Sequence, residues 1–395
     1  MHNTTVLVSG AGIAGPALAY WLHRYGFAVT VVERAPALRP GGQAIDFKSR
    51  THRTVLERMG ILDEVEQRRT GTTDTVFVDE HGSRRALMPG EFTGGDVEIL
   101  RGDLSEILYL RTAERCEYLF GDSVTALTDT AAGVHVEFEH APARTFDLVF
   151  GADGIHSRVR RLAFGPERDF VKYLGYYYAV AGASGNPAEP RERATAYAHN
   201  APGRLAISSG PKAQQMYMFA SPELDYARDD SAQQRRILTA TYAEVGWEVP
   251  RMLAELAGFD DFYMDSISQV RMPDGYSKGR VALVGDSAYG NTLGGFGTGL
   301  AVVGAYVIAG ELAVADGDHT AAFARYDELM KRYAKIAGNS NAGRFLAPKT
   351  ARGIRMRDWF LESRLFTLMT KYADHAADDI DLKDYPALVG AADAR

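Results

Sequence analysis

The chain has 395 residues, of which 46% are hydrophobic and 24% charged, and its formal net charge is −7. This length predicts about two or three domains, and the acidic balance argues against nucleic acid as a partner, because nucleic-acid-binding proteins gather positive charge. The single cysteine, Cys116, excludes a disulfide within the chain and favours a cytoplasmic protein. We expect no signal peptide. We also expect no transmembrane segment, because the apolar run 300–315 is shorter than the roughly 20 residues that span a bilayer.

The N-terminal region has the pattern of a strand, a helix and a second strand. Residues 6–8 are continuously apolar, as expected of a strand covered on both faces. Apolar residues recur at helical spacing over 13–25, and the valine-rich run 28–33 favours a second strand.

A glycine motif, Gly10-x-Gly12-x-x-Gly15, joins this first strand to the helix. The first glycine allows a tight turn, the second lets the backbone approach a pyrophosphate, and the third lets helix and strand pack closely. The helix N-terminus then faces the phosphates, and an acid at the end of the second strand accepts hydrogen bonds from a ribose. The motif predicts a dinucleotide without choosing between FAD and NAD. The expected contacts are Gly10, Gly12, Ile13, Ala14, Gly15, Glu33 and Arg34, with a solvated surface arginine as the alternative for the last.

The following segments predict smaller elements. Residues 51–69 have an apolar helical face, and 79–82 are typical of a hairpin connection. A further helix is expected over 104–112, with Asp103 as its N-cap and Glu106 at capping-box spacing.

The middle of the chain is aromatic-rich and interrupted by turns, which predicts a mostly β layer with one or two helices. The expected domains are a discontinuous nucleotide-binding domain, a substrate domain and a C-terminal helical region. Their boundaries are 1–170 with 271–315 for the first (72–100 contributing to the substrate side), 171–270 for the second and 316–395 for the third.

A second glycine-rich segment lies far from the first. The apolar run 281–284 ends at Gly285-Asp286, where a carboxylate is placed to accept a hydrogen bond from a ribitol hydroxyl. An apolar helix follows, and its N-terminus favours negative charge such as that of a reduced flavin. The candidate contacts are Gly297, Thr298 and Gly299. Two such elements suggest one cofactor held at both ends, and the alternative is a glycine-rich turn without a ligand.

Three motifs together carry a family resemblance. Asp147-Leu-Val-Phe-Gly-Ala-Asp-Gly-Ile-His-Ser-Arg158 resembles the DG fingerprint of class A flavoprotein monooxygenases, and Arg280-Val-Ala-Leu-Val-Gly-Asp286 resembles their GD fingerprint. With the first glycine motif, the chain is similar to the para-hydroxybenzoate hydroxylase family up to about residue 315. The resemblance implies an α/β fold. It would have a Rossmann-like FAD-binding domain of the glutathione-reductase type, an inserted mostly β substrate domain and C-terminal helices, with FAD bound tightly but not covalently.

The resemblance also implies further contacts. Arg101 matches the arginine that contacts the flavin in relatives, Gln43 falls in a loop that passes the cofactor, and Asp153 is the aspartate of the DG fingerprint. An Asp-Gly turn explains Asp153 without a ligand. The arginines expected to meet the phosphates of an incoming NADPH, or to form a solvated helix start, are Arg158, Arg160 and Arg161.

The implied reaction is a hydroxylation. NADPH or NADH reduces FAD, dioxygen adds at the flavin C4a, and the resulting hydroperoxide transfers one oxygen atom to an aromatic or polyketide-like molecule. We therefore expect no Ser-His-Asp triad and no metal site, and the histidines show no HExxH spacing. The alternative is an FAD-dependent dehydrogenase or reductase acting on a similar substrate. The chain is expected to act as a monomer or homodimer.

The substrate is expected between the flavin and the aromatic sheet. The candidate lining residues are Tyr176, Tyr178, Tyr197, Met216, Met218, Phe219 and Leu293, with core packing as the alternative. The chain departs from its relatives at Tyr289, where they often carry histidine, and over 290–293, where they carry proline. Proline stiffens a loop, so its absence leaves the mobility of the flavin open.

Overall fold

The computed structural model describes residues 2–38, 44–47, 49–93, 97–182, 193–208, 213–294, 297–337, 341–366, 368 and 382–385. The strands are β1 (Thr5–Ser9), β2 (Ala28–Glu33), β3 (Ala44–Phe47), β4 (Thr72–Val78), β5 (Arg84–Met88), β6 (Val97–Leu100), β7 (Glu117–Phe120), β8 (Val124–Thr130), β9 (Gly133–Phe138), β10 (Arg144–Phe146), β11 (Leu148–Gly151), β12 (Val171–Ala181), β13 (Arg193–Ala201), β14 (Arg204–Ser208), β15 (Gln215–Ala220), β16 (Tyr263–Val270), β17 (Ser277–Lys278) and β18 (Val281–Leu283).

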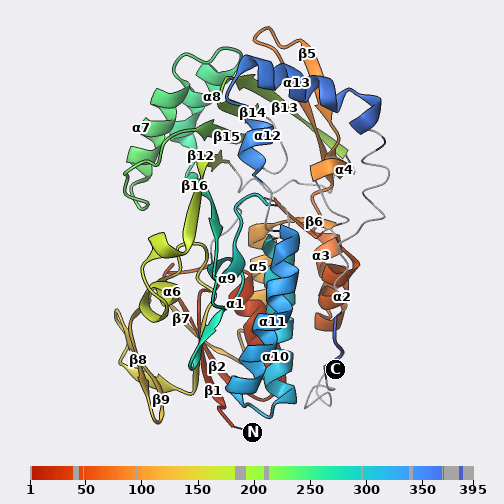
Figure 1. The fold of residues 1–395 in the computed structure, drawn as a ribbon. Coiled ribbons are helices and arrows are strands. Elements are labelled where there is room, and N and C mark those ends of the chain that lie inside the picture. The colour runs from red at the N-terminus through yellow and green to blue at the C-terminus, as the bar shows by residue number, and fades with distance from the viewer. Residues whose placement is uncertain are drawn as a thin grey trace.

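The helices are α1 (Ala14–Arg24), α2 (Arg50–Met59), α3 (Leu62–Gln67), α4 (Gly90–Thr93), α5 (Arg101–Leu110), α6 (Arg158–Ala163), α7 (Ser231–Tyr242), α8 (Val249–Glu255), α9 (Asp286–Tyr289), α10 (Gly297–Val314), α11 (His319–Ala337), α12 (Ala342–Leu346) and α13 (Ala351–Leu361), with 3₁₀ turns η1 (Glu167–Asp169) and η2 (Leu256–Gly258). Figure 1 shows an elongated molecule in which a lower part with α1, α10 and α11 joins an upper part built on a second large sheet.

The lower part is built on a six-stranded sheet in the order β17-β18-β11-β1-β2-β7. Strand β1 pairs in parallel with β2 and β11, β18 pairs in parallel with β11, and β17 is an antiparallel edge strand. The central strands are buried, which agrees with their apolar sequences, because α1 packs on β1 and β2 and a three-stranded sheet, β10-β9-β8, packs on β1 and β11. Because β1, β11 and β18 are parallel, three segments distant in sequence end at one edge of the sheet.

Helix α10 crosses this part of the molecule as a core helix. It packs against α1, α2 and α11, and nearly all of its residues are buried. Among the described helices, α10 has the length and apolar composition of a membrane span, but 78% of its 18-residue window lies inside the protein. Its apolar composition is therefore explained by burial in the core.

The upper part is built on a seven-stranded sheet in the order β16-β12-β15-β14-β13-β4-β5. Strands β4 and β5 come from the N-terminal third of the chain, and β4 pairs in parallel with β13. Helices α7 and α8 cover one face, where the buried cluster includes Tyr177 and Phe219. The other face carries Tyr178 and Met218 in a separate cluster.

The C-terminal helices divide between the two parts. Helix α11 packs on α10, whereas α12 packs on β12 and β15 and α13 packs on β5. The described residues 382–385 return to α10, where Lys383 Nζ and Tyr385 Oη donate to the buried carboxylate of Glu311 at 3.0 and 2.9 Å.

Two expectations for local structure are wrong. The helix predicted over 51–69 is two helices, α2 and α3, because Gly60 adopts a left-handed conformation (φ 68°) and ends the first. Asp103 is not an N-cap, because α5 begins at Arg101 with Leu100 in the cap position, which leaves Asp103 inside the first turn. The hairpin at 79–82 is confirmed by the Asp79 amide, which donates to Ser83 at 3.0 Å.

Candidate functional site

The loop between β1 and α1 lies against the turn that follows β11. Gly10 has φ +107°, and a Cβ on it would stand 2.5 Å from the carbonyl oxygen of Ala152. A Cβ on Gly15 would stand 1.8 Å from the oxygen of Gly10, so α1 and the loop require glycine at both positions. Ile13 precedes Ala14 as the N-cap of α1 without a side-chain cap bond, so no side chain caps the amides at this helix start.

Glu33 braces this loop from the end of β2. Its carboxylate accepts hydrogen bonds from the amides of Ala11 and Ala35, both at 2.8 Å. A carboxylate has about four acceptor positions, so lone pairs remain for a ribose. Arg34 beside it is exposed, and Gln43 lies outside the described residues.

Helix α5 flanks the same loop. Arg101 is exposed, and its Nη2 lies 3.4 Å from where a Cβ on Gly12 would stand. One turn later Ser105 Oγ donates to the carbonyl oxygen of Gly12 at 3.1 Å. We did not identify Ser105 from the sequence, although its position four residues after Arg101 places both on one helix face.

Asp286 follows the end of β18 and is the first residue of α9. It is exposed, although Gly285 and residues 287–290 are buried. Although the residue is exposed at the surface, the protein atoms packed around its carboxylate raise the pKa of Asp286 by desolvation, and the charge of Arg101 opposes that rise. A Cβ on Gly297 would stand 3.3 Å from its Oδ1, so the start of α10 approaches the carboxylate closely.

The next residues of α10 differ in exposure. Thr298 is half-buried beside Gly297, whereas Gly299 is buried. A Cβ on Gly299 would collide with the ring of His52 at 2.1 Å, so this glycine is explained by packing against α2. We call the group formed by the Gly10–Gly15 loop, Arg101, Asp286 and Gly297 the cofactor site.

Asp153 is used within its own turn. Its carboxylate accepts hydrogen bonds from Ser157 Oγ at 2.5 Å and from the amides of Arg158 and Val159 at 2.7 and 3.1 Å. Burial raises the pKa of Asp153, while these hydrogen bonds lower it. The side chain therefore orders the start of α6, and its Cα lies 2.9 Å from a Cβ position on Gly10.

The arginines of α6 are engaged with the protein. Arg160 is fully buried and donates to the carbonyl oxygens of Ser287 and Ile155 at 2.8 and 2.5 Å, so neither a solvated position nor an NADPH contact describes it. Arg158 donates to Ser123 Oγ at 2.8 Å, and Arg161 lies 3.5 Å from Glu167.

The proline-free loop is fastened to β16. The amide of Val270 donates to Gly290 O at 2.7 Å, and the amide of Thr292 donates to Ser268 O at 3.0 Å. Tyr289, which stands where relatives carry histidine, is buried and donates to Leu300 O at 3.2 Å. Backbone pairing thus holds the loop in a position that proline stiffens in relatives.

The predicted lining residues divide between the two faces of the upper sheet. Tyr178 and Met218 are buried on the face that Met216 and Leu293 also contact. Tyr176 shares this face, but its ring lies directly under α12, because a Cβ on Gly343 would stand 2.5 Å from it. That contact favours the packing interpretation for Tyr176.

Two of the predicted lining residues lie apart from the Tyr178 face. Phe219 lies on the opposite face, where its ring stacks on Tyr177 at 5.6 Å beneath α7 and α8. Tyr197 is 46% exposed, and its neighbour Ala198 is buried in the cluster on the Tyr178 face. Alternation along a strand sends neighbouring side chains to opposite faces, which removes both from the Tyr178 face.

A largely buried polar cluster, which the sequence did not reveal, links the two parts of the molecule. His156, from the turn after β11, places Nε2 3.1 Å from both carboxylate oxygens of Asp265 on β16 and Nδ1 3.0 Å from Glu167 Oε1. Tyr263 Oη donates to Asp265 at 2.7 Å, and Arg228 donates to Glu167 at 2.9 Å. Burial disfavours the charged ring, yet the two carboxylates outweigh it and raise the pKa of His156.

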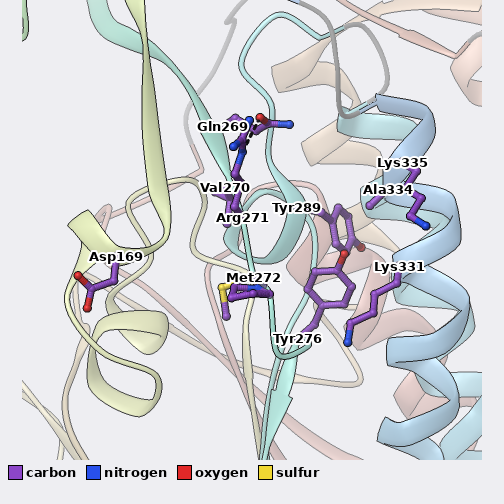
Figure 2. Close-up of a pocket in the computed structure, with 11 residues that line it drawn as sticks. Asp169, Gln269, Val270, Arg271, Met272, Tyr276, Tyr289, Lys331, Ala334 and Lys335 are labelled. Carbon is purple, nitrogen blue, oxygen red and sulfur yellow. Dashed lines mark hydrogen bonds between the residues drawn. The ribbon is translucent and has the colours of Figure 1, made fainter.

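A cavity of about 650 Å³ lies between the end of β16, α9 and α11. Figure 2 shows Tyr276 and Tyr289 on the side of α11, with Lys331 and Lys335 reaching from that helix. Arg271 lines the strand side. The volume is within the usual range for a small-molecule site, and the lining combines three cations with one carboxylate, Asp169, so its net positive charge favours an anionic ligand.

Comparison with known proteins agrees with this arrangement. The family model for the FAD binding domain matches residues 3–334. An uncharacterized protein of Mycobacterium tuberculosis (strain ATCC 25618 / H37Rv) is 43% identical over 82% of this chain and 88% of that protein. A flavin-dependent monooxygenase of Legionella longbeachae serogroup 1 (strain NSW150) is 37% identical over 84% of this chain and 86% of its own length. The structure of tetracycline destructase Tet(51) matches with a TM-score of 0.80 at 31% identity, covering 97% of this chain and 100% of that one.

These relatives favour a monooxygenase over the dehydrogenase or reductase alternative, and they confirm the predicted α/β fold with its Rossmann-like FAD-binding part. The chain belongs to the FAD-binding domain family of flavin-dependent monooxygenases, and it is an FAD-dependent hydroxylase.

Proposed function

We propose that FAD is held along the edge where β1, β11 and β18 end. Its pyrophosphate would lie at the N-terminus of α1, its adenosine ribose at Glu33 and its ribitol chain at Asp286. The exposed Asp286 carboxylate beside otherwise buried residues is the observation that carries this proposal. Arg101 and the start of α10 would flank the flavin, where positive charge and helix amides favour the reduced, anionic form.

When bound, FAD supplies the electron transfer and the oxygen activation that amino-acid side chains lack. The chain's own residues bind and orient the cofactor and shield the site from water. Arg101 balances the charge of Asp286, and Ser105 fixes the carbonyl of Gly12 beside it. The backbone pairing of loop 290–293 with β16 holds this edge of the site in place.

The electrons would come from NADPH or NADH through the cavity beside α11. Its cations, Arg271, Lys331 and Lys335, suit a pyrophosphate, and Tyr289 belongs both to its lining and to the segment that carries Asp286. The double variant Lys331→Glu with Lys335→Glu should raise the KM for the pyridine nucleotide about tenfold or more with little change in bound FAD. Arg332→Glu on the same helix, outside the lining, is the matched control. An unchanged KM in the double variant would exclude this cavity.

The substrate would be an aromatic or polycyclic small molecule that lies between the flavin and the Tyr178 face of the upper sheet. The likeness to tetracycline destructases supports a polycyclic compound, and the apolar neighbours Met216, Met218 and Leu293 suit one. Cys116 is buried and unpaired, which agrees with the proposed cytoplasmic location, and the active form would be a monomer or homodimer.

The decisive experiment uses the purified protein with its bound flavin. Oxygen uptake and NADPH or NADH oxidation are measured with and without tetracycline and with simple phenols, and products are analysed by mass spectrometry under ¹⁸O₂. The proposal expects substrate-stimulated uptake and one labelled oxygen in the product. Turnover of the substrate without oxygen uptake would contradict it.

A further inference from the structure

The polar cluster around Asp265 imposes a direction on its hydrogen bonds. The side chains of His156, Asp265 and Glu167 are 22%, 8% and 18% exposed, so water competes little for them. Both ring nitrogens of His156 face carboxylates, and a histidine donates from both nitrogens only as the imidazolium. His156 is therefore a cation between two anions, and Arg228 supplies a further positive charge to Glu167.

Asp265 is consequently an acceptor at both oxygens. Oδ1 accepts the amide of Ser266 at 2.7 Å, and Oδ2 accepts the hydroxyl of Tyr263 at 2.7 Å. The hydrogen bonds from His156 outweigh burial and lower the pKa of Asp265, so the carboxylate stays ionised at neutral pH. The hydroxyl proton of Tyr263 is therefore used in the hydrogen bond to Asp265.

The ring of Tyr178 lies beside this acceptor. It meets the ring of Tyr263 edge to face, with centroids 5.9 Å apart. Because the hydroxyl of Tyr263 donates to Asp265, its oxygen has only lone pairs to offer to any other neighbour. Tyr263 therefore presents an acceptor oxygen next to the ring of Tyr178.

The pair lies where a substrate can meet it. Tyr263 alternates with Asp265 and Ile267 on the same face as Tyr178, and it is 45% exposed. The cluster adjoins the cofactor site, because His156 lies in the turn after β11, and the Cα of Asp153 in that turn stands 2.9 Å from a Cβ position on Gly10.

We propose that Tyr263, packed against the ring of Tyr178, is a specificity-determining residue whose hydroxyl oxygen accepts a hydrogen bond from a neutral phenol or enol hydroxyl of the substrate, and that Asp265, oriented by His156, sets this polarity. This inference rests on the proposed function, since it places the substrate on the Tyr178 face. Asp265 and His156 act as positioning residues. A ligand of the same shape with an ether or carbonyl in place of the hydroxyl leaves the acceptor oxygen without a donor and binds less tightly.

The test is a pair of probes measured on the FAD-loaded full-length protein at neutral pH. Dissociation constants for 2-naphthol and its methyl ether, 2-methoxynaphthalene, are obtained from the perturbation of the flavin spectrum. The wild type should prefer the naphthol by about tenfold, the factor that corresponds to one hydrogen bond. Equal affinities, or no binding of 2-naphthol, would overturn the proposal.

Variants distinguish an effect on the direction of the hydrogen bonds from a loss of structural support. In Asp265→Asn, the amide oxygen is expected at the Ser266 amide, so the new NH₂ donates to Tyr263 and turns the Tyr263 proton outward. The naphthol preference should then fall to about onefold or reverse, and Tyr263→Phe should also abolish it. Tyr173→Phe, which removes a hydroxyl bonded to Ser221 O, is the matched control and should keep the wild-type preference.

A purely structural role would weaken both probes equally and leave their ratio unchanged in Asp265→Asn and Tyr263→Phe, which would refute the subsite. Failure of the proposed function is distinguishable, because it would appear as absence of bound FAD or of oxygen-dependent turnover. If the enzyme holds FAD and consumes oxygen but binds both probes equally, the proposed function stands and this inference is refuted.

Discussion

Replacing His156 with glutamine should destabilise the protein in a pH-dependent way. The variant removes a cation that lies 3.1 Å from Asp265 and 3.0 Å from Glu167. Breaking a buried ion pair from one side costs roughly 3–5 kcal/mol. Glu167 keeps Arg228 at 2.9 Å and Asp265 keeps the Tyr263 hydroxyl, so we expect about 3 kcal/mol, the lower end of that range.

The sign of the pH dependence follows from the pKa shifts. The pKa of His156 is raised above its ordinary 6.5, so its contribution is fully present below pH 6.5 and is lost as the pH rises through the higher folded value. The carboxylates act in the opposite sense. The pKa of Glu167 is lowered to about 2 and that of Asp265 is also lowered, so their contribution is lost as the pH falls below the ordinary carboxylate range. The gap between wild type and variant should be widest from about pH 5 to 6.5.

The assay is thermal unfolding of the FAD-loaded protein at pH 6 and pH 9, followed by circular dichroism. At about 2 °C for each kcal/mol, the variant should melt about 6 °C below the wild type at pH 6, with a smaller gap at pH 9. His135→Gln, whose ring contacts Thr145 at 3.4 Å, is the control and should change neither midpoint. An equal gap at both pH values would refute the imidazolium between two carboxylates.

Three further predictions concern the cofactor site. Gly15→Ala should prevent folding, because its Cβ would stand 1.8 Å from a backbone oxygen, whereas Gly12→Ala should fold with a wild-type melting temperature but lose FAD affinity, measured by flavin titration. Asp286→Asn should weaken FAD binding by about tenfold or more in the same titration, because a hydrogen bond to a charged group is lost. Unchanged affinity would show that Asp286 does not bind the ribitol. Tyr289→Phe should lower stability by about 1 kcal/mol in urea unfolding through loss of its bond to Leu300 O, while the flavin spectrum stays the same.

Strand-end motifs were predictable because their chemistry is local. The spacing of Gly10, Gly12 and Gly15 reflects contacts within one β-α turn, and the structure shows those contacts in the collisions that added Cβ atoms would make. The position of Asp286 at the end of an apolar strand is equally local. Parallel pairing of β1, β11 and β18 then brings the separate motifs to one edge.

Side-chain direction was harder to predict where two faces of a sheet are both apolar. Phe219 and Tyr177 face α7 and α8, whereas Tyr178 and Met218 face the other way, and both faces are buried. A strand apolar on both sides has no hydrophobic alternation to show which face meets the substrate. The start of α5 was predicted three residues too late, because Asp103 and Glu106 have the spacing of a capping box, whereas the helix already begins at Arg101.

By itself, the sequence determined the family, the FAD-binding elements and the end of each strand that carries them, because those properties depend on residues close together in the chain. Tertiary structure decided which polar groups are neighbours. His156, Glu167 and Asp265 are separated by up to 109 residues, yet they form one largely buried cluster. Only the packing of β16 against the turn after β11 brings them together, and their charges then set the direction in which Tyr263 offers its hydrogen bond.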